Sequence, residues 1–162
     1  IFEFQKFTMK SIYQTNFNNQ KVLVRVDFNV PLSSDKKVTD NSRIVAAKKT
    51  IDKITNDGGT AILMSHLGRP KSKDPELSLM HIVKSVEDVL GKPVAFLKET
   101  IGKETQQVVE NSLPGQIILL ENLRYHKNCP ETSPECQKWW LKWKIFSADA
   151  AKLGSKPPGF RF

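Results

Sequence analysis

Basic and polar residues follow the short apolar runs of this chain and open one of its helical segments. The basic and polar ones are Asp27, Asn29, Arg43, His66, Arg69 and Arg124, and Phe28, Leu67 and Gly68 lie between them in the same loops. The planar guanidinium of an arginine donates paired hydrogen bonds to a phosphate or a carboxylate. An aspartate and an asparagine can bind a hydroxyl group. These residue types therefore suit a small ligand that carries several negative charges.

Each of these residues also has an ordinary structural explanation. An arginine at the start of a helix, such as Arg43, is often only solvated, and its charge opposes the helix dipole there. Asp27 is a residue type that forms turns at strand ends. A single histidine such as His66 often only braces a loop. The grouping of three arginines with this histidine is the feature that favours an anion site.

Apolar spacing predicts four strands that alternate with three helices. The strands are expected at 21–27, 60–64, 94–97 and 116–120, where valine, isoleucine and leucine run together. The helices are expected from Arg43 to a stop at Gly58, from a cap at Ser78 to Gly91, and over 103–111 with Val108 and Val109 inward. This order indicates an α/β fold, a Rossmann-like parallel sheet with helices on both faces. Ligands of such sheets bind beyond the carboxyl ends of the strands, where the residues above lie.

Other kinds of site have no support in the sequence. Neither of the common glycine-rich phosphate loops, G-x-x-x-x-G-K-[ST] or G-x-G-x-x-G, occurs. Cys129, Cys136 and three histidines lack the spacing of a zinc site, and the cysteines are interpreted as reduced thiols of a cytoplasmic protein. No apolar run reaches about 18 residues, and no secretory signal opens the chain. We therefore expect no metal, no cofactor in this chain and no membrane partner.

Positive charge is concentrated near the end of the chain. Residues 1–135 hold 19 Lys and Arg against 16 Asp and Glu, whereas residues 136–162 hold 6 against 1 and all three tryptophans. This shift predicts a boundary near Glu135 and argues against a nucleic-acid partner for the first part. Trp139, Trp143 and Phe146 recur at helical spacing, so the tail is expected to add no strand to the sheet. A basic helix for a partner or a membrane surface is the alternative interpretation of the tail.

Five segments resemble phosphoglycerate kinase in their order and spacing. They are KVLVRVDFNVPL at 21–32, TDNSRIVAAKKTI at 39–51, LMSHLGRPK at 63–71, LGKPVAFL at 90–97 and ILLENLRY at 118–125. On this resemblance, residues 1–8 are expected to be a non-native leader and residues 9–135 part of the N-terminal, phosphoglycerate-binding domain. Residues 136–162 do not align, and we expect them to come from a frameshift, a misassigned exon or a truncated reading frame.

The resemblance implies a glycolytic kinase, a transferase that moves a phosphoryl group between 1,3-bisphosphoglycerate and ADP to give 3-phosphoglycerate and ATP. Asp27 and Asn29 would then hold the hydroxyl region of the substrate, and Phe28 between them would belong to the substrate-binding residues. Arg43 would hold the ligand and stabilise charge on the transferring group. His66, Arg69 and Arg124 would bind the far phosphate. Leu67 and Gly68, in the same loop as His66 and Arg69, would also belong to the substrate-binding residues.

The same resemblance implies a second domain for the nucleotide. Mg-ADP or Mg-ATP would bind there, and members of the family are usually monomeric. This chain alone is therefore expected to bind the glycerate without turning it over. A non-catalytic module that binds phosphoglycerate or a protein partner is the alternative.

Overall fold

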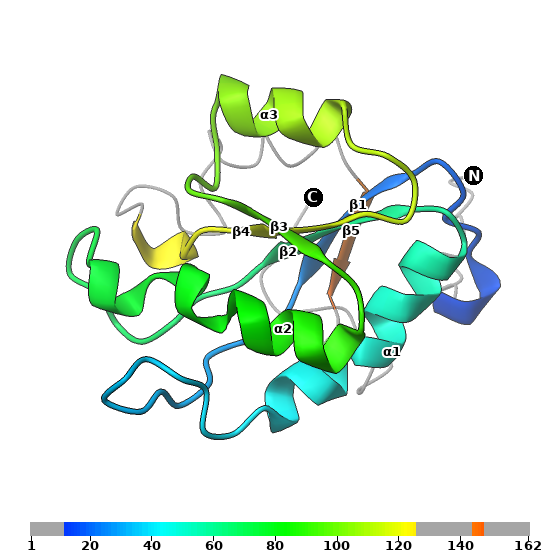
Figure 1. The fold of residues 1–162 in the computed structure, drawn as a ribbon. Coiled ribbons are helices and arrows are strands. Elements are labelled where there is room, and N and C mark those ends of the chain that lie inside the picture. Colours follow the sequence, from blue (N-terminus) through cyan, green and yellow to red (C-terminus); the bar gives the residue numbers. More distant parts are fainter. Residues whose placement is uncertain (1–11, 126–143, 148–162) are drawn as a thin grey trace, which may run out of the picture.

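The fold is built around a parallel sheet of five strands in the order β3-β4-β2-β1-β5 (Figure 1). The structure is a computed structural model that describes residues 12–125 and 144–147. The strands are β1 (Lys21–Arg25), β2 (Thr60–Met64), β3 (Val94–Leu97), β4 (Ile117–Leu120) and β5 (Lys144–Ser147). Every pair of neighbouring strands is parallel.

Helices cover both faces of this sheet. The helices are α1 (Ser42–Asn56), α2 (Val83–Leu90) and α3 (Lys103–Glu110), with single 3-10 turns at η1 (Ile12–Gln14), η2 (Pro75–Leu77), η3 (Leu79–Ile82) and η4 (Leu123–Tyr125). In Figure 1, α1 and α2 lie on one side of the sheet and α3 on the other. The predicted α/β class, with a parallel sheet between two helical layers, is confirmed.

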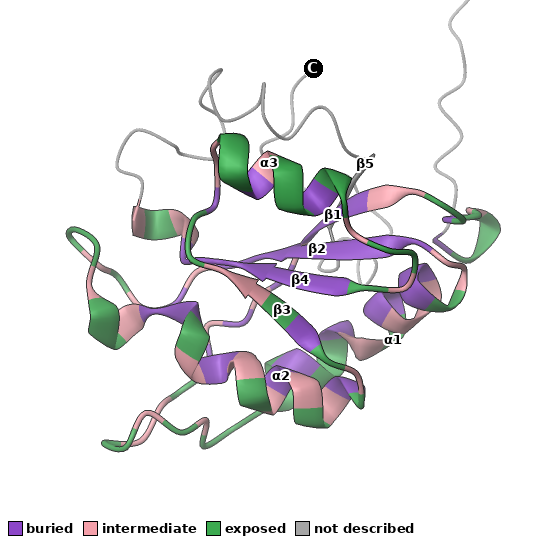
Figure 2. Ribbon diagram, turned by 45° about the horizontal axis from the view of Figure 1, so that its top comes forward, coloured by how far each residue is buried: buried purple, intermediate pink, exposed green. Residues whose placement is uncertain are grey.

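Two apolar clusters, one on each face, hold the sheet between the helices (Figure 2). Successive side chains of a strand point to opposite faces. Val22 and Val24 of β1 accordingly join the cluster with α1 and α2, while Leu23 joins the cluster with Val109 of α3. All residues of β2 and β4 are buried. Strands covered on both faces need continuous apolar sequences, which explains why apolar and polar residues do not alternate along β2 and β4.

The strand β5 corrects the prediction that the tail adds no strand. It pairs in parallel with β1, so Phe146 lies in a strand and not on the face of a helix. Trp139 and Trp143 lie outside the described residues. The apolar pair Ile145 and Phe146 is too short for its periodicity to separate a strand from a helix. Pairing with an already formed parallel strand decides the conformation of such a segment.

The inward face of α3 corrects a second prediction. Val109 is fully buried, but Val108 is 39% exposed. Adjacent helical residues are separated by about 100° around the axis, because a turn has about 3.6 residues. Only one of the two valines can therefore face the sheet.

Some sequence predictions concern residues outside the described part of the chain. These are the leader at 1–8, the boundary near Glu135 and the two cysteines. In the described part, no helix has the length and apolar character needed to cross a membrane. The same residues contain no group of three or more His, Cys, Asp or Glu side chains arranged to hold a metal ion.

Candidate functional site

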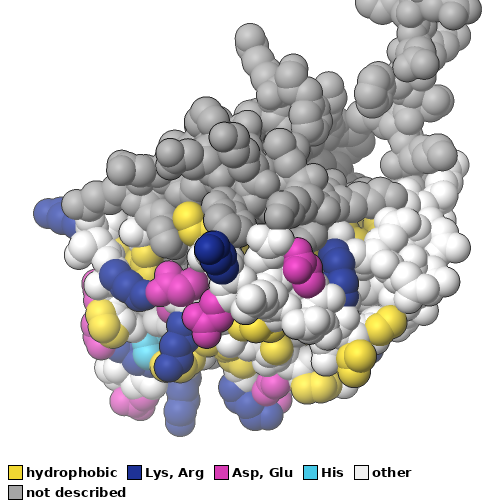
Figure 3. Space-filling model, turned by 90° about the horizontal axis from the view of Figure 1, so that it is seen from above, with side chains coloured by type: hydrophobic (Ala, Val, Ile, Leu, Met, Phe, Trp, Pro, Cys, Tyr) yellow, Lys and Arg dark blue, Asp and Glu magenta, His cyan; other side chains and the backbone are white. Residues whose placement is uncertain are grey.

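The carboxyl ends of β1, β2 and β4 lie along one edge of the sheet. These three strands are neighbours and run in the same direction, so the loops that follow them meet there. In Figure 1 this edge can be found from the yellow turn η4, which lies at the left of the picture. Figure 3 shows a histidine with basic and acidic side chains at the left of the described surface, and further charged side chains across its centre. We call this edge the carboxyl rim.

A cavity of about 230 Å³ opens at the carboxyl rim between β1, β2 and the start of α1. Its lining consists of Arg25, Val26, Asp27, Asn29, Arg43, Ser65, His66 and Leu123. Four of the predicted site residues, Asp27, Asn29, Arg43 and His66, are thus brought together from three separate segments. Arg69 and Arg124 are exposed on the adjoining turns.

Two predicted residues contribute to this site only through their main chain. The side chains of Phe28 and Leu67 are 0% and 3% exposed and belong to the apolar core. The N–H of Phe28 donates to the Ser65 hydroxyl, at 2.9 Å. These two side chains therefore anchor their loops to the core and leave the polar neighbours at the surface.

Asp27 and Arg43 form an ion pair across the cavity. A guanidinium nitrogen of Arg43 contacts a carboxylate oxygen of Asp27, and both side chains are about half exposed. The other carboxylate oxygen of Asp27 accepts the N–H of Asn29, at 3.3 Å. The helix α1 places Arg43 here because Arg43 is the second residue of that helix. Asp27 therefore orients Arg43 towards the cavity as well as offering an acceptor of its own.

Asn29 and Arg124 both hold the peptide groups of Gly68. The N–H of Gly68 donates to the side-chain oxygen of Asn29, at 2.9 Å, and the carbonyl of Gly68 accepts from the Arg124 guanidinium. Gly68 has a φ of +60°, a conformation that residues with a side chain seldom adopt. A Cβ atom at this position would also meet Leu77 at 2.8 Å. The loop after β2 is thus fixed to both neighbouring loops through one glycine.

His66 lies among the positive charges of the rim. Burial lowers the pKa of His66 below its ordinary value, and the charge of Arg124 lowers it further. Arg25 and Arg43 act in the same direction, whereas Asp27 opposes them. At neutral pH the imidazole is therefore uncharged and can donate one hydrogen bond. A bound anion would offset the arginine charges and favour protonation of this ring.

Arg25 is a lining residue that the sequence reasoning missed. It is the last residue of β1 and stands two positions before Asp27. Side chains two positions apart in an extended segment point to the same side. This alternation within the run from Lys21 to Asp27 was the signal that could have identified Arg25.

The loop after β4 is anchored by a buried carboxylate. Glu121 is 6% exposed and accepts hydrogen bonds from the Ser78 hydroxyl at 2.7 Å and from the Leu79 N–H at 2.9 Å. Ser78 also accepts the N–H of Met80, as its predicted role as a helix cap requires. A negative charge at the start of η3 is favoured because the first N–H groups of a helix have no carbonyl partner within it. Glu121 therefore ties the end of β4 to the helix beneath the rim.

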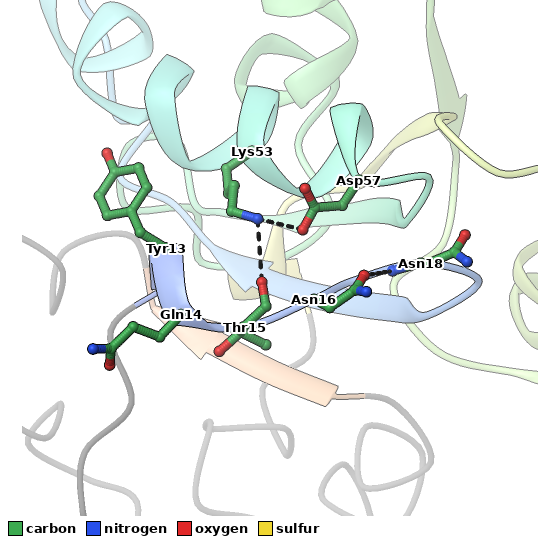
Figure 4. A pocket seen from close by; sticks show the side chains of 7 residues that line it. All are labelled: Tyr13, Gln14, Thr15, Asn16, Asn18, Lys53 and Asp57. Carbon is green, nitrogen blue, oxygen red and sulfur yellow. Dashed lines mark hydrogen bonds and ion pairs between the residues drawn. The ribbon is translucent and has the colours of Figure 1, made fainter.

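A second, larger depression lies beside η1 and the end of α1 (Figure 4). It encloses about 510 Å³ and is lined by Tyr13, Gln14, Thr15, Asn16, Asn18, Lys53 and Asp57. Its charged groups bind their own neighbours, since Lys53 donates to Asp57 and to the Thr15 carbonyl and Asp57 accepts the Phe17 N–H. This depression is therefore explained by the attachment of η1 to α1. We place the candidate site at the smaller cavity, where the strand ends converge.

Comparison with known proteins identifies one family. A family model described as phosphoglycerate kinase matches residues 12–154. The chain is similar to the phosphoglycerate kinase of Aspergillus oryzae, with 48% identity over 118 residues, which are 72% of this chain and 28% of the relative. It is 45% identical to that of Pelodictyon phaeoclathratiforme over 146 residues, 90% of this chain and 34% of the relative.

A solved structure agrees with these sequence matches. The phosphoglycerate kinase of Pyrococcus horikoshii superposes with a TM-score of 0.73 at 25% identity, covering 86% of this chain and 36% of that protein. The chain thus spans about a third of the length of the relatives that it matches. The family match also runs past Glu135 and includes β5.

Proposed function

The chain belongs to the phosphoglycerate kinase family, and from this premise we propose that its carboxyl rim binds 3-phosphoglycerate and 1,3-bisphosphoglycerate. The reaction is the transfer of a phosphoryl group between 1,3-bisphosphoglycerate and ADP, which gives 3-phosphoglycerate and ATP. On this proposal, the chain supplies the surface that holds the phosphoglycerate.

One observation carries the proposal: Arg25, Arg43 and His66 line a single cavity together with Asp27 and Asn29. Phosphoglycerate has a phosphate at one end, a carboxylate at the other and a hydroxyl between them. Guanidinium groups match the two anionic ends, and the aspartate–asparagine pair matches the hydroxyl. Arg124 and Arg69 lie on the turns next to the cavity and extend the positive surface for the far phosphate.

The proposed role of the rim in phosphoryl transfer is to position the substrate and to neutralise charge. This chemistry needs no protein nucleophile, because the attacking and leaving groups are both substrate oxygens. Arg43 is the residue we assign to the transferring group, since it lines the cavity from the first turn of α1. Held there by Asp27, it needs little rearrangement when negative charge develops.

We further propose that Mg-ADP and Mg-ATP bind to residues outside this sequence. The 162 residues contain neither of the common glycine-rich phosphate loops. On this proposal the chain by itself binds phosphoglycerate without making ATP, acts as a monomer and works in the cytoplasm. A coupled assay for ATP formation, followed through successive purification steps, tests this: turnover that survives purification would contradict it.

Calorimetric titration of the chain with 3-phosphoglycerate tests the binding proposal. We expect saturable binding of 3-phosphoglycerate and much weaker binding of glycerate, which lacks the phosphate. Replacing Arg124 by alanine should raise the dissociation constant about tenfold, the loss expected for one charge-assisted contact.

Lys84→Ala is the matched control for charge. Lys84 is 80% exposed, pairs with Asp88 on α2 and is not among the residues that line the cavity. Its removal also subtracts one positive charge but should leave the dissociation constant unchanged. Equal losses of affinity in Arg124→Ala and Lys84→Ala would indicate that net charge alone attracts the ligand, and would contradict a site at the rim.

A further inference from the structure

The side chain of Asn122 is fully buried directly behind the carboxyl rim. It follows Glu121, at the end of β4, and precedes Leu123, which lines the cavity. Its exposed fraction is 0%, so it cannot touch a ligand in the cavity. Neither the reaction chemistry nor the substrate contacts proposed above assign it a role.

The amide of Asn122 makes hydrogen bonds to three different points of the rim. Its nitrogen donates to the Leu67 carbonyl and to the Leu77 carbonyl, each at 2.8 Å. Its oxygen accepts the N–H of Arg124, at 3.1 Å. Both amide hydrogens are thus in use, and one buried group connects the turn η4 with both ends of the loop after β2.

These bonds enclose the contact between Arg124 and Gly68. The Arg124 guanidinium donates to the Gly68 carbonyl. Asn122 holds the main chain of Arg124 on one side of that contact and the neighbouring carbonyl of Leu67 on the other. The Leu123 N–H also donates to the Ser65 carbonyl, at 3.1 Å, and the Tyr125 hydroxyl donates to the Asp74 carbonyl. Of these links between the two segments, the Asn122 amide is the one that binds on both sides of the Arg124–Gly68 contact.

Only an amide fits this position among side chains of similar size. Two carbonyl acceptors and one N–H donor face it, so it must present two donors and one acceptor. An aspartate would turn oxygen atoms towards two carbonyl oxygens. An unpaired buried carbonyl is costly, and the loops would have to move apart to reach water.

We propose that Asn122 is a positioning residue that sets the affinity of the rim for the phosphate of its ligand by holding Arg124 in place before binding. The inference rests on the proposed function of the rim. A flexible arginine must lose conformational freedom when it grips an anion, and an arginine that is already held loses less. Asn122 makes no contact with the ligand and acts through Arg124.

A double-mutant cycle on the 162-residue chain tests the proposal. The dissociation constant of 3-phosphoglycerate is measured by calorimetry for the unmodified chain, Asn122→Ala, Arg124→Ala and the double variant, each at protein concentrations where melting curves show it folded. We expect Asn122→Ala to weaken binding about tenfold, and the double variant to bind no more than about twofold weaker than Arg124→Ala. If Asn122→Ala does not melt cooperatively, Asn122→Ser, which keeps a hydroxyl donor, replaces it and should lose less affinity.

Thr60→Val is the control for general destabilisation. Thr60 is 2% exposed, and its hydroxyl donates to the Leu113 carbonyl at the opposite end of β2. Thr60→Val should therefore lower the melting temperature without changing the dissociation constant of 3-phosphoglycerate. Two results would overturn the inference but not the proposed function. One is an unchanged dissociation constant in Asn122→Ala or Asn122→Ser. The other is a loss of affinity that adds fully to the loss caused by Arg124→Ala. Absence of binding in the unmodified chain would overturn the proposed function and the inference together.

Discussion

At the scale of a single residue, His66 makes the free energy of unfolding depend on pH. Its pKa in the folded chain lies below its ordinary value of 6.5, because of burial and of the charge of Arg124. As the pH falls through about 6.5, the unfolded chain takes up the proton before the folded chain does. The free energy of unfolding should therefore decrease with falling pH in this range.

His66→Gln separates this effect from the carboxylates. Asp40, Asp57 and Glu76 also have lowered pKa values, but they begin to take up protons in more acidic solution. Urea denaturation at several pH values between 5 and 8 should give a shallower pH dependence for His66→Gln than for the unmodified chain. Parallel curves for the two proteins would contradict the assigned environment of His66.

Arg43 gives the residue-scale prediction for catalysis. In an enzyme that joins this domain to a nucleotide-binding domain, Arg43→Ala should lower kcat by about a hundredfold or more while changing the KM for 3-phosphoglycerate less, since its charge matters most as the phosphoryl group transfers. Arg43→Lys, which keeps the charge without the paired donors, should recover part of the rate. Steady-state kinetics with both variants checks this, and equal changes in kcat and KM would indicate a role in ground-state binding only.

Gly68 controls the loop after β2 at the scale of one element. Gly68→Ala forces a side chain into the left-handed region, at a cost of about 1–2 kcal/mol, and brings its Cβ against Leu77. The Gly68 carbonyl should then move away from Arg124, and binding of 3-phosphoglycerate should weaken. Gly91→Ala is a close control, because Gly91 has a φ of +68° with nothing within 4 Å of a Cβ. Both variants should lower the melting temperature, but only Gly68→Ala should weaken binding.

The strand β5 gives a second prediction for an element. It pairs with β1 and covers an edge that would otherwise be open to other chains. A chain that ends after residue 143 should melt several degrees lower than one that ends after residue 147, since 1 kcal/mol shifts the melting temperature of a domain of this size by about 2–4 °C. The shorter chain should also bind more of a dye that recognises exposed apolar surface. Identical melting curves would contradict the pairing of β5 with β1.

The same elements show what the sequence can and cannot predict. The apolar runs at 60–64 and 94–97 coincide with β2 and β3. The run of β2 is buried throughout, as a strand covered on both faces requires, whereas β3 is an edge strand in which only Val94 is buried. The segment of β5 was missed, since its conformation depends on pairing with β1. The residue types at the rim were predicted from the strand ends, but their mutual contacts were not. That Asn29 holds Gly68 and that Asn122 lies behind Arg124 depend on loop conformations with no periodic signal.

At the scale of the whole molecule, the parallel sheet separates two ends with different roles. The carboxyl rim gathers Arg25, Arg43 and His66 around one cavity, while the opposite end holds the depression beside Lys53, whose charges bind one another. Any ligand bound at the rim should stabilise the entire domain, because only the folded chain brings these segments together. Saturating 3-phosphoglycerate should therefore raise the melting temperature, and this effect should shrink in high salt.

A residue-by-residue NMR titration with 3-phosphoglycerate tests the central claim, that the carboxyl rim is the binding site, most directly. Backbone amide signals of the isotope-labelled chain are followed as the ligand is added. The account predicts saturable shifts at Asn29, Gly68 and Arg124, with a dissociation constant that increases with ionic strength, and little change at Asn18 and Lys53. Saturable shifts confined to the depression beside Lys53, or no shifts at all, would contradict it.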